Sequence, residues 1–141
     1  MAAEHTTDAV TTAGPRILLY SDDLDTRAQV RLGVGKRLGR GAPDIDWTET
    51  ATPAAALAAA EAGGYDLFVF DGEAPKVGGM ALARQVKDEL YNCPPVLVLT
   101  GRPQDAWLAA WSDADAVVSQ PLDPIELQST VAGLLSPARA R

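Results

Sequence analysis

The chain has 141 residues, of which 47% are hydrophobic and 22% are charged, so its composition favours one globular domain that is large enough to bury a core. Its net charge of −7 argues against a nucleic-acid surface, which needs clustered lysine and arginine. We expect no membrane insertion, because no apolar run approaches the roughly 20 residues of a span. The single cysteine, Cys93, precludes an internal disulfide and favours a cytoplasmic location.

The chain reads as a flexible tail over residues 1–14, one domain over 15–135 and a short exit tail over 136–141. Within the domain, five apolar runs alternate with five helical stretches. Three of the runs are continuously apolar, as in central parallel strands that helices cover on both faces. The second run alternates apolar and polar residues and so belongs at a sheet edge. In chain order the runs are Ile17–Tyr20, Ile45–Thr48, Leu67–Phe70, Val96–Leu99 and Ala116–Val118.

Several helices carry start signals. A cap residue precedes a proline at Thr52 and again at Asp123. In the first helix Val30, Val34 and Leu38 fall at spacings of four residues, which places them on one helical face. This alternation of strands and helices predicts an α/β fold with a doubly wound parallel sheet, in which functional residues lie beyond the carboxyl ends of the strands.

Carboxylates gather at those strand ends. Asp22 and Asp23 follow the first run, and Asp71 and Glu73 follow the third. Such an edge repels phosphate but suits a hard divalent cation, which prefers carboxylate oxygens. Asp22 and Asp23 have a second interpretation as caps of the first helix, and Asp71 as a simple strand-end cap.

Residues 15–135 resemble a receiver domain of bacterial two-component response regulators. Four fragments in order carry the resemblance: RILLYSDDLDTR, FVFDGEAPKVGG, VLVLTG and ADAVVSQPLDP. The resemblance implies a flavodoxin-like (βα)5 fold with strand order 2-1-3-4-5. It also implies that Asp71 is the phosphoacceptor, that Thr100 is the hydroxyl residue of the site and that Mg²⁺ is the cofactor. The implied metal ligands are Asp22, Asp71 and the backbone carbonyl of Glu73, with Asp23 as an alternative.

The chain also departs from this family. Ser21 stands where receivers carry the first of two acids, and Gln120 stands where they carry a lysine that holds a phosphoryl oxygen. A glutamine brings no charge, and charge-assisted hydrogen bonds are about twice as strong as neutral ones. Val117 occupies the place of the aromatic switch residue. We therefore expect only weak Mg²⁺ binding, and by resemblance a cis peptide bond between Gln120 and Pro121.

Three further side chains are candidates for the switch or the interface. Trp107 and Trp111 lie four residues apart on the expected fourth helix, where they belong either to the edge of the core or to a partner-binding patch. Arg102 is the nearest cation to Asp71 by sequence, with Lys76 as an alternative, and we expect it to pair with Glu73 over the pocket.

Three functions remain to be weighed. The leading hypothesis is an atypical, stand-alone receiver that is not an enzyme and binds a protein partner through helix 4, strand 5 and helix 5, with phosphorylation weak or dispensable. The second is a conventional receiver that a histidine kinase phosphorylates at Asp71, or that serves in a phosphorelay. The third is a phosphatase with an aspartyl intermediate and Glu73 as general acid. A homodimer remains a further option, and the sequence names neither the kinase nor the pathway.

Overall fold

The computed structural model describes residues 13–73, 78–102, 107 and 112–136. Its five strands form one parallel sheet in the order β2-β1-β3-β4-β5, as predicted. None of the helices in the described ranges is long and apolar enough to cross a membrane. The strands are β1 (Arg16–Tyr20), β2 (Asp46–Thr50), β3 (Leu67–Asp71), β4 (Val96–Thr100) and β5 (Ala116–Ser119), and the helices are α2 (Leu24–Val34), α3 (Pro53–Ala62), α4 (Gly78–Glu89) and α6 (Pro124–Leu134).

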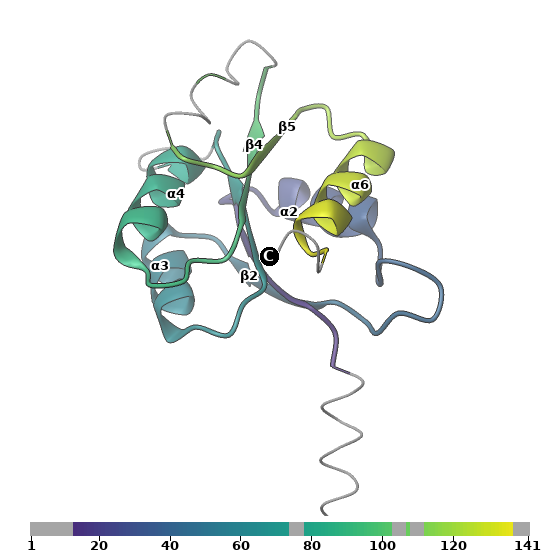
Figure 1. The fold of residues 1–141 in the computed structure, drawn as a ribbon. Helices are drawn as coiled ribbons and strands as arrows, with labels where there is room; N and C mark the ends of the chain where they lie inside the picture. Colours follow the sequence, from purple (N-terminus) through teal and green to yellow (C-terminus); the bar gives the residue numbers. More distant parts are fainter. Residues whose placement is uncertain (1–12, 74–77, 103–106, 108–111, 137–141) are drawn as a thin grey trace, which may run out of the picture.

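The sheet separates two helical layers, with α2 and α6 on one face and α3 and α4 on the other (Figure 1). Successive residues of a strand point to opposite faces. In β1, Leu19 packs into the core beneath α2 and α6, whereas Leu18 and Tyr20 pack into the core beneath α3 and α4. The continuous apolar runs of β1, β3 and β4 therefore follow from burial on both faces.

Two helix starts agree with their sequence signals. The side chain of Thr52 accepts a hydrogen bond from the backbone N–H of Ala55 at 3.1 Å, and that of Asp123 accepts one from Ile125 at 3.1 Å. These bonds satisfy backbone donors that the first turn of a helix leaves unpaired. The fourth predicted helical stretch lies outside the described residues except for Trp107.

The end of α2 differs from the prediction. The helix stops at Val34, because Gly35 adopts a φ of 91° that ends helical geometry and that side chains rarely tolerate. Val30 and Val34 are buried as expected, but Leu38 lies beyond the helix and packs against the same core from the following loop. The spacing of apolar residues therefore continued past the true end of the helix.

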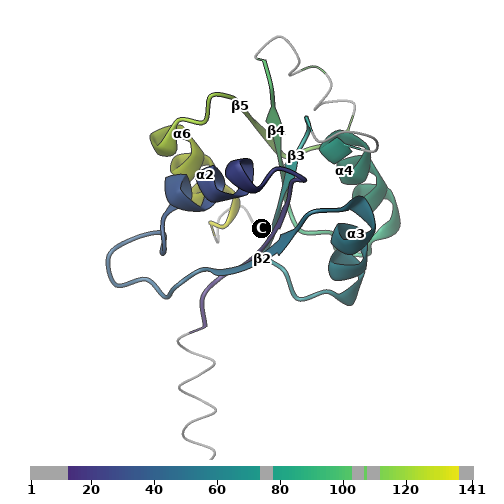
Figure 2. The same ribbon diagram turned by 180° about the vertical axis from the view of Figure 1, so that it is seen from behind.

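Strand β2 is an edge strand, as its alternating pattern predicted, but its bounds are shifted. It begins one residue later than expected and extends to Thr50. Ile45 falls outside the strand because its N–H donates to the carbonyl of Lys36 at 2.9 Å. At the other end the Thr50 hydroxyl donates to the Leu19 carbonyl at 3.1 Å, which fastens a polar stretch to β1. Polar residues are tolerated there because one side of the strand has no neighbour (Figure 2).

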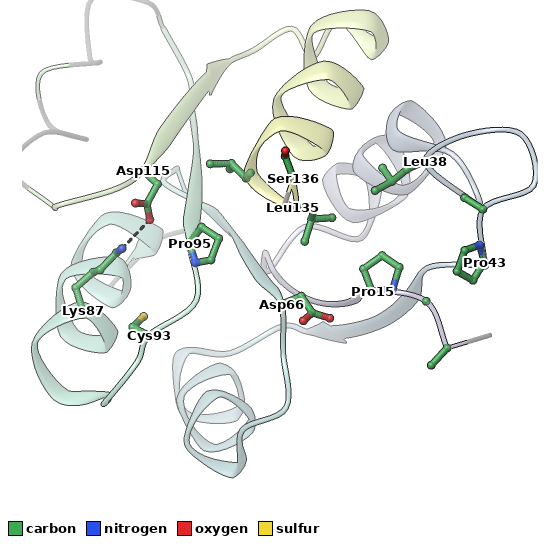
Figure 3. Close-up of a pocket in the computed structure, with 14 residues that line it drawn as sticks. Pro15, Leu38, Pro43, Asp66, Lys87, Cys93, Pro95, Asp115, Leu135 and Ser136 are labelled. Carbon is green, nitrogen blue, oxygen red and sulfur yellow. Dashed lines mark hydrogen bonds and ion pairs between the residues drawn. The ribbon is translucent and has the colours of Figure 1, made fainter. Parts of the chain in front are cut away.

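A cavity of about 650 Å³ lies at the amino ends of the strands, away from the predicted site (Figure 3). Asp66, Pro95 and Asp115, each at the approach to a strand, contribute to its lining. Two of its polar side chains are paired: the Lys87 ammonium donates to the Asp115 carboxylate at 2.6 Å, and the same carboxylate accepts the Val96 N–H at 2.7 Å. These bonds join α4, β4 and the residue before β5 at the wall of the cavity.

Candidate functional site

Asp71 is the last residue of β3 and is almost fully buried, with 3% of its surface exposed. The start of α4 approaches it closely, since a Cβ placed on Gly79 would lie 2.5 Å from the Asp71 carbonyl oxygen. The glycine at position 79 is therefore required by the packing of the helix against the strand end. The arrangement fixes the backbone of Asp71 and aims its carboxylate beyond the carboxyl edge of the sheet.

Two donors hold the Asp71 carboxylate. The Ser21 hydroxyl donates to Oδ2 at 2.8 Å, and the backbone N–H of Glu73 donates to Oδ1 at 2.9 Å. Burial nonetheless raises the pKa of Asp71, and the nearby negative charges of Asp22 and Glu73 raise it further, against the lowering effect of the two hydrogen bonds. No cation of the described residues contributes to this shift. The carboxylate therefore sits in a negative and partly dehydrated environment.

Ser21 links Asp71 to the loop that follows β1. It is fully buried, and its hydroxyl oxygen also accepts the backbone N–H of Asp23 at 3.0 Å. The backbone carbonyl of Ser21 accepts a hydrogen bond from the Arg27 guanidinium at 2.6 Å. Where the resemblance implies the first of two acids, the chain thus has a neutral hydroxyl that donates a hydrogen bond directly to the Asp71 carboxylate. Sequence reasoning recognised the substitution but not the bond that it makes.

The two acids after Ser21 have different surroundings. Asp23 is the N-cap of α2, since its carboxylate accepts the Asp25 N–H and the Thr26 hydroxyl, each at 3.0 Å. Asp22 is exposed, and its charge raises the pKa of both Asp71 and Tyr20. Asp23 therefore caps α2. Asp22 is the acid of this loop whose charge acts on the Asp71 carboxyl group.

The neighbouring strand ends carry a second polar group. Thr100, at the end of β4, is fully buried, and its hydroxyl shares a 2.9 Å hydrogen bond with that of Ser119. The Gln120 N–H donates to the Thr100 carbonyl at 2.8 Å, and the Gln120–Pro121 peptide is cis, as predicted. Sequence reasoning missed Ser119, although the register that pairs it with Thr100 makes the contact direct.

Comparison with known proteins identifies the family. The chain is 52% identical over 120 residues to two uncharacterized response regulatory proteins from strains of Mycobacterium tuberculosis, which covers 85% of this chain and 90% of each relative. The chain belongs to the response regulator family. No protein-family model matches it.

Solved receiver structures share the fold of this response regulator. The Francisella response regulator 1452 receiver domain matches with a TM-score of 0.74 at 22% identity, over 91% of this chain and 100% of that chain. The response regulator TrrA of Thermotoga maritima, solved in complex with Mg²⁺-BeF, matches with a TM-score of 0.71 at 24% identity, over 86% and 99%. The flavodoxin-like arrangement of the sheet is therefore confirmed.

The remaining predicted residues of the regulator surround the site at different distances. Glu73 extends to the end of β4, because a Cβ on Gly101 would meet its side chain at 2.8 Å. The two loops are thus neighbours, as expected, and the pairing of Glu73 with Arg102 stays a prediction. Trp107 is 68% exposed, and Val117 lies half-buried on β5. Lys76 and Trp111 lie outside the described residues.

The donor set suits a divalent cation only in part. Asp22 and Asp71 would offer carboxylate oxygens, and the family resemblance implies the backbone carbonyl of Glu73 as a third oxygen. Within the described ranges, no three histidine, cysteine or acidic side chains form a cluster able to hold a metal. The residues therefore fit a cation that keeps most of its water, as Mg²⁺ does with one or two carboxylates.

Proposed function

We propose that this response regulator is an atypical single-domain receiver that signals by binding another protein, and that phosphorylation at Asp71 is weak or dispensable. The surroundings of Asp71 carry the proposal: the carboxylate is buried, two acids raise its pKa, and no described cation offsets them. Phosphoryl transfer depends on positive groups that neutralise the charge of the incoming oxygens. A site with this charge balance disfavours the transfer.

Gln120 supports the same conclusion. Its backbone is fixed by the hydrogen bond to the Thr100 carbonyl, so its side chain starts from the position that the family gives to lysine. A neutral amide there offers a hydrogen bond of about half the strength of a charge-assisted one. The Thr100 hydroxyl is in turn engaged by Ser119. Two groups that would contact a phosphoryl group are thus weakened or occupied.

A divalent cation remains compatible with this function. Asp22, Asp71 and the carbonyl of Glu73 would hold Mg²⁺, and the precedent is the Thermotoga regulator that was solved with Mg²⁺-BeF. When bound, the ion would neutralise part of the charge that Asp22 and Asp71 concentrate at the strand ends. The hydroxyl of Ser21 replaces one acid of the family's set, so we expect the affinity for Mg²⁺ to be low.

The partner-binding face is the second element of the proposal. We propose that it comprises β5, α6 and the fourth predicted helical stretch, which contains Trp107 and is distinct from α4. Its binding partner is a protein, with a histidine kinase as one option. Trp107 and Ile125 are 68% and 80% exposed on this surface, and aromatic residues are enriched at interfaces. Val117 is half-buried and stands where the family has its aromatic switch residue. Because that aromatic residue is replaced, partner binding at this face need not depend on phosphorylation of Asp71.

Incubation with acetyl phosphate and Mg²⁺ followed by intact-mass measurement tests the proposal. We expect little or no phosphorylated wild-type protein, and a clear gain in Gln120→Lys because a cation then faces Asp71. Gln120→Met, which is similar in length but neutral, should behave like the wild type, and Asp71→Asn should abolish any adduct. A stable stoichiometric adduct on the wild type would instead establish a conventional receiver, and rapid turnover of acetyl phosphate would establish a phosphatase.

A further inference from the structure

The free edge of β2 carries a regular row of backbone N–H and C=O groups. The Asp46 N–H donates to the Pro15 carbonyl at 2.9 Å, and the Thr50 carbonyl accepts the Ser21 N–H at 3.2 Å. In a parallel pair, alternate residues of a strand bond to the same neighbour. Asp46, Thr48 and Thr50 therefore bond to β1. The N–H and C=O groups of Trp47 and Glu49 consequently point away from the sheet.

These outward groups have no backbone partner within the described part of the chain. The edge is limited at its start, because the Ile45 N–H is already bonded to Lys36. Two donors and two acceptors thus remain in a row, from Trp47 and Glu49. Such an edge is a template for another strand unless charge, proline or a bulge blocks it. Asp46–Thr50 contains no proline and pairs with β1 in an unbroken register. Its two acids, Asp46 and Glu49, are each paired with arginine of the same chain.

The spacing of the open groups is self-complementary. If two copies of β2 run antiparallel about a two-fold axis through Thr48, Trp47 lies opposite Glu49 of the partner subunit. Opposed residues at such a position exchange both backbone hydrogen bonds. The two symmetric pairs then use all eight open groups of the two copies in four hydrogen bonds. We propose that the protein forms a homodimer through antiparallel pairing of its β2 strands, which joins two sheets into one of ten strands.

The side chains agree with this register. On the face toward α3, Thr48 meets Thr48 of the partner subunit on the axis, and Asp46 lies opposite Thr50 of the partner subunit. On the other face Trp47 meets the partner's Glu49. Threonine pairs and pairs without like charges are favourable across antiparallel strands. No like charges are directly opposed within Asp46–Thr50, so the charge pattern permits a second copy of this chain.

A hollow beside the edge gives the second copy apolar surface to cover. A cavity of about 670 Å³ lies between α2 and β2, lined in part by Leu32, Ile45 and Trp47. Leu32 is 82% exposed, which is high for a large apolar side chain. Figure 2 shows α2 beside β2 on one face of the sheet. A two-fold axis perpendicular to the sheet would keep both copies of α2 on the same side of the joined sheet, so the two hollows would lie on one face, on either side of the seam. A closed two-fold contact of this kind is the commonest form of homodimer.

Disulfide trapping tests the register directly in a Cys93→Ser background. Thr48→Cys places two thiols on the axis, where non-hydrogen-bonded residues have Cα atoms about 4.5 Å apart, within disulfide range. Asp46→Cys is the matched control on the same strand face, because its two copies would lie about 14 Å apart. We expect covalent dimer from Thr48→Cys under mild oxidation at a rate at least roughly tenfold above the control. Equal rates for the two variants would overturn the proposal.

Sedimentation measurements on the unmodified chain provide the second test. We expect the average mass to rise toward twice the monomer mass with concentration. Thr48→Lys, which puts like charges on the axis, should weaken association roughly tenfold or more, while Thr48→Val keeps the β-branched shape and should leave it unchanged. A protein that stays monomeric at every concentration, or a dimer that survives Thr48→Lys and so uses another face, would contradict the β2 interface.

Discussion

The two edges of the sheet each hold a carboxylate, and the two carboxylates have opposite electrostatic surroundings. At the amino edge, Asp115 accepts hydrogen bonds from the Lys87 ammonium at 2.6 Å and from the Val96 N–H at 2.7 Å. At the carboxyl edge, Asp71 is held by a hydroxyl and a backbone N–H, and its neighbours in charge are acids. The first carboxylate is neutralised by the fold, whereas the second carries a charge that the described residues leave uncompensated.

This contrast separates a structural role from a functional one. A partly buried carboxylate with a cation and a backbone donor ties strands together and needs nothing further. A buried carboxylate among acids costs stability and persists where it serves chemistry or binding. The family resemblance implies that Asp71 is the phosphoacceptor position. Ser21 and Gln120 stand where the resemblance implies charged groups around it.

The largest predicted effect is at the amino edge. Asp115→Ala should lower the free energy of unfolding by about 2 to 3 kcal/mol, because it leaves the Lys87 charge without its partner and the Val96 N–H without its acceptor. Urea denaturation measures the change. Asp88→Ala, which removes an exposed acid from the same helix α4, is the control and should stay within about 0.5 kcal/mol. Equal effects of the two changes would show that the Lys87–Asp115 pair has no structural role.

Removal of the Ser21 hydroxyl should have a smaller effect with a distinct signature. Ser21→Ala takes a donor from Asp71 and an acceptor from the Asp23 N–H, and we expect a loss of about 1 to 2 kcal/mol in unfolding free energy. The Ser21 hydrogen bond lowers the pKa of Asp71, so its removal should raise that pKa further. A titration of the Asp71 carboxyl carbon by NMR checks the direction. An unchanged pKa would mean that the hydroxyl does not contact the carboxylate in solution.

Neutralising Asp71 should stabilise the protein. Asp71→Asn is expected to raise the free energy of unfolding at pH 7 by about 1 kcal/mol, since it removes an uncompensated buried charge and keeps a similar shape. Burial raises the folded-state pKa of Asp71, so the folded wild type binds more protons than the unfolded chain between the ordinary pKa and the raised one. Wild-type stability from this group therefore falls as pH rises through that interval.

The gain in unfolding free energy of Asp71→Asn over the wild type should therefore be complete above the raised pKa. It should vanish as the pH falls to the ordinary pKa of a carboxyl group. Urea denaturation of both proteins across this range tests the sign. A variant that is less stable than the wild type at pH 7, or an advantage that grows on acidification, would show that Asp71 is compensated by charges outside the described residues.

The strands were predictable because they depend on local patterns, whereas their order was implied by the family resemblance. The apolar runs of β1, β3 and β4 indicate burial on both faces, and a carboxylate directly after β3 must lie at the carboxyl edge. The end of α2 at Gly35 was missed because apolar spacing continued to Leu38. The Thr100–Ser119 bond was missed because it depends on the register between two strands distant in sequence.

Loop contacts were the other limit of sequence reasoning. Whether Asp23 caps α2 or faces the acceptor depends on how the chain turns after β1, and neighbouring acids look alike in a sequence. The side chain of Glu73 lies against Gly101, a contact that the sequence did not indicate, and its pairing with Arg102 stays a prediction.

The central claim is that the neutral Gln120 weakens the binding of a phosphoryl group. The most direct test is the binding of beryllofluoride, a phosphoryl mimic, in the presence of Mg²⁺. Tryptophan fluorescence and the NMR shifts of residues 21–23 and 71–73 report the binding. The wild type should bind the mimic roughly tenfold or more weakly than Gln120→Lys, since a charge-assisted contact replaces a neutral one. Arg102→Ala should alter the binding rate only if Arg102 covers the site. Tight binding by the wild type with no gain from Gln120→Lys would contradict the atypical site and establish a working phosphoreceiver.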